Sequence, residues 1–383
     1  MSEIADIETI RQGVAYKELR FSVSRTDLSN ALSKINGVVE RRNAIDVLAC
    51  VNIKAQHNKI KLMATDLDIS IFASFSANIL TEGEVKVSAH TLHDIVRKLP
   101  TDSNVDFAVN NQGKLLISCG NANFSLPNVV SDRFPALEED DYKHDFILLS
   151  VDLVDLLTKT KFAVSLDDTR YNLNGIYMHT DESFLYCVAT DGHRLSCIKK
   201  PKPHQIHKEF SVIIPRKTVT ELLKMLDESD KVSIKLSERK IKFMCGEYIL
   251  ISKLIDGVFP DYKTVIPEFQ DKYMIVESKK LSDVIDRVSV VISDKVKSIK
   301  FSLQEKKLTL YSNSQECSDA TESIDIEYNG APMEVGFNSR YLLDVLSSIK
   351  NKCRFSFIDG NSATKITDED DLNALYIVMP MRT

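Results

Sequence analysis

The sequence has no unbroken apolar run that approaches ~18 residues, so we expect no membrane-spanning helix. It also lacks long glycine, serine or proline tracts. With 43% hydrophobic and 27% charged residues, this composition argues against disorder and supplies enough apolar side chains for buried cores. The first 18 residues lack the basic segment and following apolar segment of a secretory signal, so we expect an extension of unassigned role. At 383 residues, length predicts two or three domains.

The sequence also lacks any CxxC pair, and its seven cysteines are odd in number. Most of them stand in apolar, strand-like runs, which favours buried, reduced thiols in the cytosol over a disulfide framework. The cysteines are Cys50, Cys119, Cys187, Cys197, Cys245, Cys317 and Cys353.

No GxSxG, HExxH or P-loop pattern is present, which disfavours several enzyme classes. Asp191 and His193 lie close to Ser196, but neighbours on one turn cannot easily form the geometry of nucleophile, base and orienting group. His90 and His93 share a predicted helix without a third ligand nearby, whereas a zinc site needs three or four. We therefore predict no catalytic residues, no metal site and no cofactor.

Net positive charge is missing too: 49 basic against 55 acidic residues give −6, which argues against nucleic-acid binding unless the charge is unevenly distributed. Basic residues do recur on or beside six predicted helices, whereas acidic runs occupy 137–141 and 367–371. Two interpretations stay open: ordinary solvated helix faces, or one positive surface that attracts a phosphate backbone without reading sequence. The basic residues are Lys34, Arg41, Arg42, Arg97, Lys98, Lys159, Lys161, Arg216, Lys217, Lys224, Lys279, Lys280, Arg287, Arg340 and Lys350.

What the sequence does contain is an internal repeat. "LMATDLDIS" and "CVATDGHRLS" share Ala-Thr-Asp, with aspartates at Asp66 and Asp191, an offset of 125. The Phe-Pro pairs of "RFPAL" and "VFPDY" recur at the same offset, as do Asp27 and Asp152 at two helix starts. The first two thirds of the chain therefore represent a diverged duplication.

A third copy is fainter: 277–288 resembles the helix around Asp152, and 338–349 resembles 215–226. The sequence thus predicts an extension at 1–18 and three domains at 19–143, 144–271 and 272–383. Three similar domains in tandem would form an arc, and two arcs joined head to tail would close a ring of six domains.

Each repeat reads as strand, helix and further strands, twice over, which predicts an α+β fold of two helices packed on curved antiparallel sheets. In the first repeat, Asp27 stands where an N-cap belongs, as Asp152 does in the second. The apolar face of that first helix is predicted to contain Leu28, Leu32 and Ile35, followed by Val38 or Val39.

The chain ends on "YIVMPMRT", an apolar strand-like segment where termini are usually polar. Together with "ATDGHRLS", "PRK" and "FPDY", it resembles the bacterial sliding clamp, the β subunit of DNA polymerase III, from Leu19 to the C-terminus. The resemblance implies a ring-shaped homodimer that encircles double-stranded DNA in the bacterial cytoplasm. It also implies that the protein has no catalytic activity and binds no nucleotide.

The resemblance further implies partners: the polymerase III catalytic subunit, a clamp loader, and other clamp-binding polymerases and repair proteins, with no membrane. They would bind through a peptide groove between the second and third domains. Methionines suit a groove that serves many partners because their side chains repack easily. The groove residues so implied are Leu173, Thr190, Gly192, His193, Arg194, Leu195, Pro260, Val265, Ile377, Val378, Met379, Pro380, Met381 and Arg382.

By the same resemblance, Arg42, Tyr171, Arg216 and Lys217 face DNA. Phe124 and Leu126 of the first domain would meet Val290 and Val291 of the third at the ring joint. The sequence departs from the family at two places: Thr264 stands where arginine is frequent, and Asn172 where a second tyrosine is frequent. A repeat-type interaction scaffold that does not encircle DNA is the alternative function.

Overall fold

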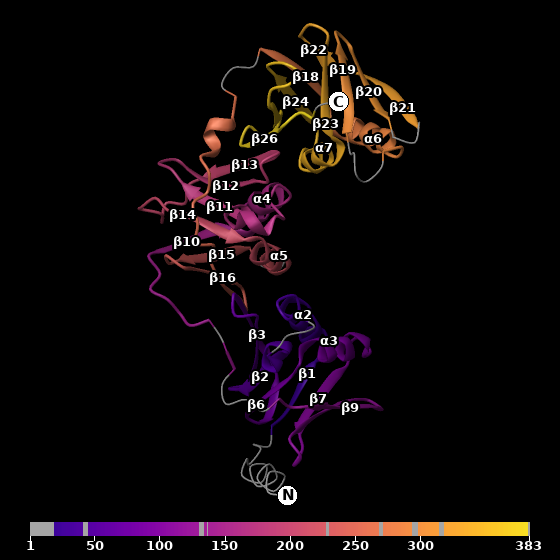
Figure 1. The fold of residues 1–383 in the computed structure, drawn as a ribbon. Coiled ribbons are helices and arrows are strands. Elements are labelled where there is room, and N and C mark those ends of the chain that lie inside the picture. The colour runs from indigo at the N-terminus through magenta and orange to yellow at the C-terminus, as the bar shows by residue number, and fades with distance from the viewer. Residues whose placement is uncertain are drawn as a thin grey trace, which may run out of the picture. The chain divides into compact units, whose positions relative to one another are not determined.

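The computed structural model describes residues 19–40, 45–129, 134–135, 137–226, 230–267, 271–292, 298–313 and 318–381. They divide into two compact units, one drawn from 1–150 and 220–253 and the other from 151–219 and 254–383. Figure 1 shows the course of the chain, with antiparallel sheets and helices in each unit. The predicted α+β class is confirmed.

The first unit holds a five-stranded and an eight-stranded sheet, in the orders β5-β1-β7-β8-β9 and β10-β15-β16-β17-β4-β3-β2-β6. The strands are β1 (Arg20–Ser24), β2 (Cys50–Gln56), β3 (Lys59–Thr65), β4 (Ile69–Ser76), β5 (Asn78–Thr81), β6 (Gly83–Ser88), β7 (Asn104–Val109), β8 (Lys114–Cys119), β9 (Ala122–Pro127), β10 (His144–Leu149), β15 (Lys231–Leu236), β16 (Lys240–Cys245) and β17 (Tyr248–Lys253).

The second unit holds a nine-stranded and a four-stranded sheet, in the orders β14-β11-β12-β13-β26-β25-β24-β18-β22 and β21-β20-β19-β23. The strands are β11 (Gly175–Thr180), β12 (Phe184–Thr190), β13 (Arg194–Pro201), β14 (Ser211–Pro215), β18 (Lys272–Glu277), β19 (Ser298–Gln304), β20 (Lys307–Asn313), β21 (Asp319–Asp325), β22 (Glu327–Tyr328), β23 (Met333–Asn338), β24 (Lys352–Phe357), β25 (Thr364–Asp368) and β26 (Ala374–Val378).

The helices pack on these sheets, α2 beside α3 and α6 beside α7. No helix in the described ranges is long and apolar enough to cross a membrane. The helices are α2 (Arg25–Ile35), α3 (Ala89–Lys98), α4 (Ser150–Lys161), α5 (Arg216–Met225), α6 (Ser278–Ser289) and α7 (Ser339–Leu346), with short 3₁₀ turns η1 (Asp46–Ala49), η2 (Asp168–Leu173) and η4 (Tyr262–Val265).

The predicted apolar face of α2 is confirmed, since Leu28, Leu32 and Ile35 are at most 2% exposed. Both alternatives for its last position, Val38 and Val39, are buried in the following turn. The N-cap prediction is wrong: α2 begins three residues earlier, and the Ser24 hydroxyl accepts a hydrogen bond from the Asp27 amide. Asp27 instead lies in the first turn, where its charge complements the helix dipole. Asp152 likewise lies within the first turn of α4, so it is not an N-cap either.

Two of the helix lysines depart from the expected exposed basic surface. Lys34 is 7% exposed, and its Nζ lies 4.6 Å from the ring centroid of Tyr248 on β17. Lys159 forms ion pairs with Asp155 at 2.9 Å and Asp371 at 2.8 Å. Both ammonium groups contact other residues of their own unit, so their positive charge contributes less to the electrostatic potential at the protein surface.

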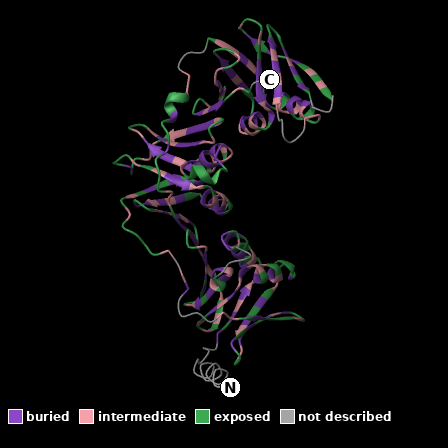
Figure 2. Ribbon diagram, in the orientation of Figure 1, coloured by how far each residue is buried: buried purple, intermediate pink, exposed green. Residues whose placement is uncertain are grey.

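Along most strands, buried side chains alternate with more exposed ones, as the pattern of colours in Figure 2 shows. The six cysteines in the described part of the chain are buried and free, whereas Cys317 lies outside it. Burial raises the pKa of the Cys245 and Cys353 thiols to about 12, so both are protonated at neutral pH.

Each unit contains one sheet that joins strands from two sequence repeats. In the first unit, β17 of the second repeat pairs with β4 of the first. In the second unit, β26 of the third repeat pairs with β13 of the second. The last strand of one repeat therefore extends the sheet of the repeat before it, and this pairing positions the site described next.

Candidate peptide-binding site

The C-terminal strand is held by backbone hydrogen bonds on both sides of its end. β26 runs antiparallel to β13, with Leu195 opposite Ile377. Beyond the strand, the Met379 amide donates to the His193 carbonyl at 2.8 Å, and the Met381 amide donates to the Gly336 carbonyl at 2.8 Å. The tail segment is thus fixed between the second and third repeats, and we call its surroundings the tail site.

A tight turn before β13 sets the direction of the tail site. One carboxylate oxygen of Asp191 accepts from the His193 and Arg194 amides at 2.9 and 3.0 Å. The Thr190 hydroxyl accepts from the Gly192 amide at 3.1 Å and donates to the Arg194 carbonyl at 2.7 Å. Gly192 has φ +89°, a conformation that favours glycine because it has no Cβ.

Arg194 connects three elements of the second unit. Its guanidinium donates to Asp191 at 3.1 Å, to Asp344 on α7 at 2.5 Å and to the Phe162 carbonyl at 2.6 Å. The ring of Tyr341, also on α7, lies 4.4 Å from the guanidinium carbon. The Phe162 ring also lies near the guanidinium, at 5.3 Å from its carbon. Because Arg194 contacts both the turn and α7, it orients the turn and anchors α7 beside it.

Beneath the turn lies a buried apolar cluster that contains three of the predicted groove residues, Leu173, Leu195 and Ile377. Its floor is aromatic: the rings of Tyr177 and Phe259 stack with centroids 4.7 Å apart. The remaining members of the cluster are Val188, Cys197, Ile213, Phe259 and Tyr262.

Two titratable groups of the cluster, Tyr262 and Cys197, and the neighbouring His179 are uncharged at neutral pH. Burial lowers the pKa of His179, whose Nε2 lies 2.9 Å from the Tyr262 hydroxyl. Burial also raises the pKa of Tyr262, and it raises that of the Cys197 thiol to about 11. The tail site therefore has a neutral, apolar floor that suits the apolar side chains of a ligand.

The predicted groove residues differ in what they can offer to a ligand. Met379, Met381 and Val265 are 41%, 38% and 49% exposed, and His193, Gly192 and Pro260 are exposed as well. Ile377 and Val378 are at most 2% exposed, so they hold the tail strand in place. Thr190, Arg194 and Pro380 are intermediate, and Arg382 lies outside the described residues.

Both departures from the family pattern have local partners. The Thr264 hydroxyl donates to the Asp261 carbonyl at 2.7 Å within its own 3₁₀ turn. The Asn172 amide donates to the Val258 carbonyl at 2.8 Å, which ties η2 to the segment before η4. Thr264 and Asn172 are shorter than the arginine and the tyrosine that are frequent at these positions in the family. Their hydrogen bonds instead stabilise loops next to the tail site.

Three of the predicted DNA-facing residues lie together around one pocket of about 450 Å³. Tyr171, 57% exposed, comes from η2, and Arg216 and Lys217 begin α5. Asp168 and Asp256 line the same pocket, so its charge is mixed. Arg42, the fourth predicted residue, lies outside the described residues.

The predicted ring-joint residues lie in different units, each near a sheet edge. Phe124 and Leu126 are on β9, an edge strand of the five-stranded sheet, and are 37% and 7% exposed. Val290, 81% exposed, and Val291 follow α6, which packs on the edge strand β21 of the four-stranded sheet. Within the described residues, β9 and β21 each pair on one side only.

Sequence reasoning missed the contribution of α7 and of the loop after α4. Asp344, Tyr341 and Phe162 all contact Arg194, yet none stands in a motif that marked the tail site. The repeat alignment does pair Asp344 with Glu221, but the ion pair that Asp344 forms with Arg194 joins residues 150 positions apart. No local signal in the sequence predicts that contact.

Comparison with known proteins points to one family over nearly the whole chain, from residue 19 to residue 382. Three family models match in order: the DNA polymerase III beta subunit N-terminal domain over 19–138, its central domain over 148–261 and its C-terminal domain over 263–382. The Caulobacter vibrioides beta sliding clamp is 36% identical over 371 residues, which cover 95% of this chain and 100% of the relative.

Solved structures agree as well. A C. crescentus beta sliding clamp with polyethylene glycol bound superimposes with a TM-score of 0.92 at 35% identity, covering 96% of this chain and 100% of that one. A Bartonella birtlesii sliding clamp bound to griselimycin has the same TM-score at 38% identity, with the same coverage. These matches establish three tandem clamp domains in this chain.

Proposed function

The chain belongs to the DNA polymerase III beta subunit family, and we propose that it is a DNA sliding clamp, which encircles duplex DNA and tethers polymerases to it. The observation that carries the proposal is the ordered match of all three clamp domains over nearly the whole chain. It favours the clamp over a general interaction scaffold. Within the chain, we place the domains at 19–143, 144–271 and 272–383.

The tail site is proposed as the groove for partner peptides. Its neutral, aromatic floor and the exposed side chains of Met379, Met381 and Val265 suit a short segment with large apolar residues. The buried residues Ile377 and Val378 would position the methionines, and Arg194 would position the turn that carries His193. Arg382, which follows Met381 in the sequence, is proposed as part of the same groove.

Ring closure is proposed to join the first domain of one copy to the third domain of another. The exposed side of β9 carries Phe124, and the end of α6 beside β21 carries Val290. Edge strands with unpaired backbone groups readily pair with a strand of another chain. A head-to-tail joint used twice would close a homodimeric ring.

The proposed partners are duplex DNA, a second copy of this chain, the polymerase III catalytic subunit, a clamp loader and further clamp-binding polymerases and repair proteins. The family is that of an accessory subunit, so we propose a protein without catalytic activity that acts in the bacterial cytoplasm. Contact with DNA would involve phosphates alone, without reading sequence.

Reversing the charge of Arg216 and Lys217 tests the DNA-facing assignment. We expect the R216E/K217E variant to be retained on circular DNA about 10-fold less well at moderate salt, because two cationic contacts become repulsive. The measurement is the amount of clamp that stays with nicked circular DNA after loading, over a series of salt concentrations. The salt dependence should also become shallower, as expected when phosphate contacts are lost.

The matched control is Lys307→Glu, an exposed lysine on β20 away from the pocket-lining residues. It should leave retention unchanged, and the oligomeric state of all variants should match that of the natural protein. Equal retention of R216E/K217E and Lys307→Glu would contradict the assignment of Arg216 and Lys217 to DNA contact.

A further inference from the structure

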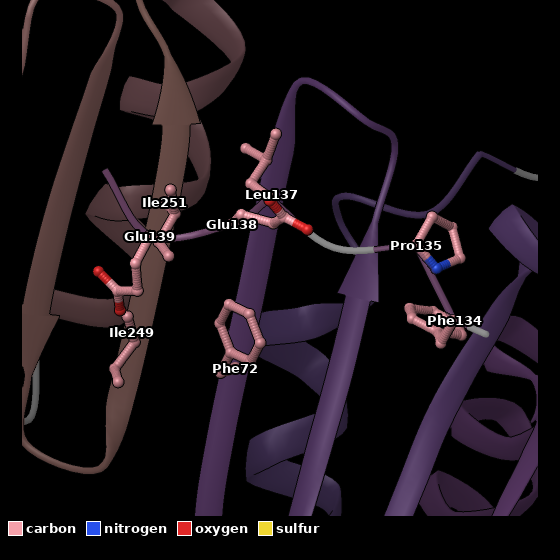
Figure 3. A pocket seen from close by; sticks show the side chains of 8 residues that line it. All are labelled: Phe72, Phe134, Pro135, Leu137, Glu138, Glu139, Ile249 and Ile251. Atoms are coloured by element: carbon pink, nitrogen blue, oxygen red, sulfur yellow. The ribbon is translucent and has the colours of Figure 1, made fainter. Parts of the chain in front are cut away.

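The first unit contains a pocket of about 560 Å³ that the proposed function does not use. Figure 3 shows Phe72 on β4, Ile249 and Ile251 on β17, and the segment that crosses these strands. Phe72, Ile249 and Leu137 are half-buried, so their apolar surfaces can be reached from solvent. We call this pocket the junction pocket, and its described lining residues are Phe72, Phe134, Pro135, Leu137, Glu138, Glu139, Ile249 and Ile251.

The junction pocket corresponds to the tail site, one repeat earlier in the chain. At the offset of 125, Phe134, Pro135 and Leu137 correspond to Phe259, Pro260 and Tyr262, and Phe72 corresponds to Cys197. The residues on the other side of the pocket also correspond, as the strand register shows. Ile249 lies opposite Phe72 as Leu375 lies opposite Cys197, and Ile251 lies opposite Ser70 as Ile377 lies opposite Leu195. All six apolar residues of the pocket therefore have counterparts in or beside the tail site.

The turn beside the pocket repeats as well. Leu67 has φ +78°, and its counterpart Gly192 has φ +89°. Four hydrogen bonds recur around these two residues. In the first repeat they are Leu67 N to Thr65 Oγ1 at 3.1 Å, Thr65 Oγ1 to Ile69 O at 2.8 Å, Asp68 N to Asp66 Oδ1 at 2.9 Å and Ile69 N to Asp66 Oδ1 at 2.7 Å.

The two sites differ in charge. Glu138 and Glu139 stand at the positions that Lys263 and Thr264 occupy in the second repeat. Both glutamates line the junction pocket, and they are the charged residues among the described residues that line it. Glu139 forms an ion pair with Lys242, and the Glu138 carbonyl accepts from Lys240 at 2.9 Å. The charged side chains of the described lining are therefore two carboxylates, of which that of Glu139 is already paired with Lys242. Their negative charge favours a cationic side chain next to an apolar one in the occupant.

We propose that the junction pocket is a second peptide-binding site, which takes a short partner segment with adjacent large apolar side chains and a flanking lysine or arginine. The occupant follows from two features: the apolar walls duplicate those of the tail site, and the rim is acidic. The inference rests on the proposed role of the tail site as a peptide groove. The two sites would let one chain hold two different segments, selected by their flanking charge.

The test follows methyl signals of the full-length chain labelled at isoleucine, with Ile251 reporting on the junction pocket and Ile377 on the tail site. The probe is the peptide Ac-Lys-Lys-Leu-Leu-Phe-NH2, compared with Ac-Glu-Glu-Leu-Leu-Phe-NH2 and Ac-Lys-Lys-Ala-Ala-Ala-NH2. We expect the basic apolar probe to shift Ile251 with saturation on the order of 0.1–1 mM. The acidic probe should bind at least about 5-fold more weakly at Ile251, and the alanine probe should cause no saturable shift.

Two variants and one matched control test whether the change in the Ile251 methyl signal comes from binding in the junction pocket. Ile249→Ala should weaken probe binding at Ile251 about 5-fold or more, whereas Ile147→Ala, at an exposed position on β10 of the same sheet, should not. Glu138→Lys changes only the rim and should reverse the preference between the basic and acidic probes. Deleting residues 379–383 should leave the Ile251 response unchanged.

A peptide from the polymerase III catalytic subunit serves as the control for the tail site and should shift Ile377. If that peptide shifts Ile377 while no probe shifts Ile251 with saturation, the junction pocket is not a peptide site and the groove assignment stands. If Ile251 responds but Ile377 responds to nothing, the pocket is supported and the proposed groove fails. If Glu138→Lys and Ile249→Ala both leave the response at Ile251 unaltered, the proposal that the junction pocket binds peptides is also wrong.

Discussion

Removing residues 379–383 is expected to weaken binding of a partner peptide about 10-fold or more. The deletion takes away Met379 and Met381, which present the exposed apolar surface beside the buried cluster. Fully burying an exposed methionine side chain contributes about 1.5–3 kcal/mol. Because these two methionines are 41% and 38% exposed, covering both contributes about 1–2.5 kcal/mol, which the deletion removes. The measurement is the dissociation constant for a peptide from the polymerase III catalytic subunit, by calorimetry or fluorescence anisotropy.

The deletion should leave the rest of the protein intact. Two backbone hydrogen bonds are lost, from Met379 to His193 and from Met381 to Gly336, at a net cost of about 1–2 kcal/mol in stability. The ion pairs of Arg194 are formed upstream of the deletion and should persist. Leu372→Ala, at an exposed position before β26, is the matched control and should bind peptide normally. A deleted protein that binds peptide with unchanged affinity would contradict the groove assignment.

The second large effect is expected at the ring joint. Phe124→Asp combined with Val290→Asp places a carboxylate on each of the two surfaces proposed to meet. Burying an unpaired carboxylate would cost about 2 kcal/mol or more at each joint, and a ring of two copies has two joints. We therefore expect the dimer dissociation constant to rise about 1,000-fold or more. Light scattering at micromolar concentration should report a mass near that of one 43.3 kDa chain.

The control for the joint is on the opposite edge of the same sheet. Leu80 is 72% exposed on β5, whereas Phe124 is on β9 at the other edge. Leu80→Asp introduces the same charge and should leave the mass at that of a dimer. Equal masses for the joint variant and the natural protein would show that Phe124 and Val290 are not at the interface.

Local patterns predicted the elements of the fold well. The helical spacing of Leu28, Leu32 and Ile35 is sufficient to predict the buried face of α2, because the apolar side of the helix must pack against the sheet. The start of α2 was harder to predict, because Ser24 and Asp27 are both good N-cap residues and lie three positions apart. Burial of Lys34 depends on Tyr248, a strand residue from the next repeat, so no local pattern indicates it.

The candidate site was predictable in outline because its parts carry unusual residues. Gly192, which adopts a positive φ, and the two methionines near the chain end are visible in the sequence itself. The contacts of Arg194 with Asp344 and Tyr341 depend on how α7 packs, which sequence spacing does not encode. The Phe-Pro repeat marked Phe134 in the sequence, but only the pairing of β4 with β17 reveals the junction pocket.

Encirclement of DNA by this chain can be tested through the topology of the DNA. The protein is loaded onto nicked circular DNA by its clamp loader with ATP, freed of loader by gel filtration, and measured before and after the circle is cut. We expect the clamp to co-migrate with the intact nicked circle and to be lost after the circle is linearised by a single cut, because a ring slides off a free end. Retention that is the same on circular and linear DNA would contradict encirclement and favour a scaffold or an ordinary basic surface.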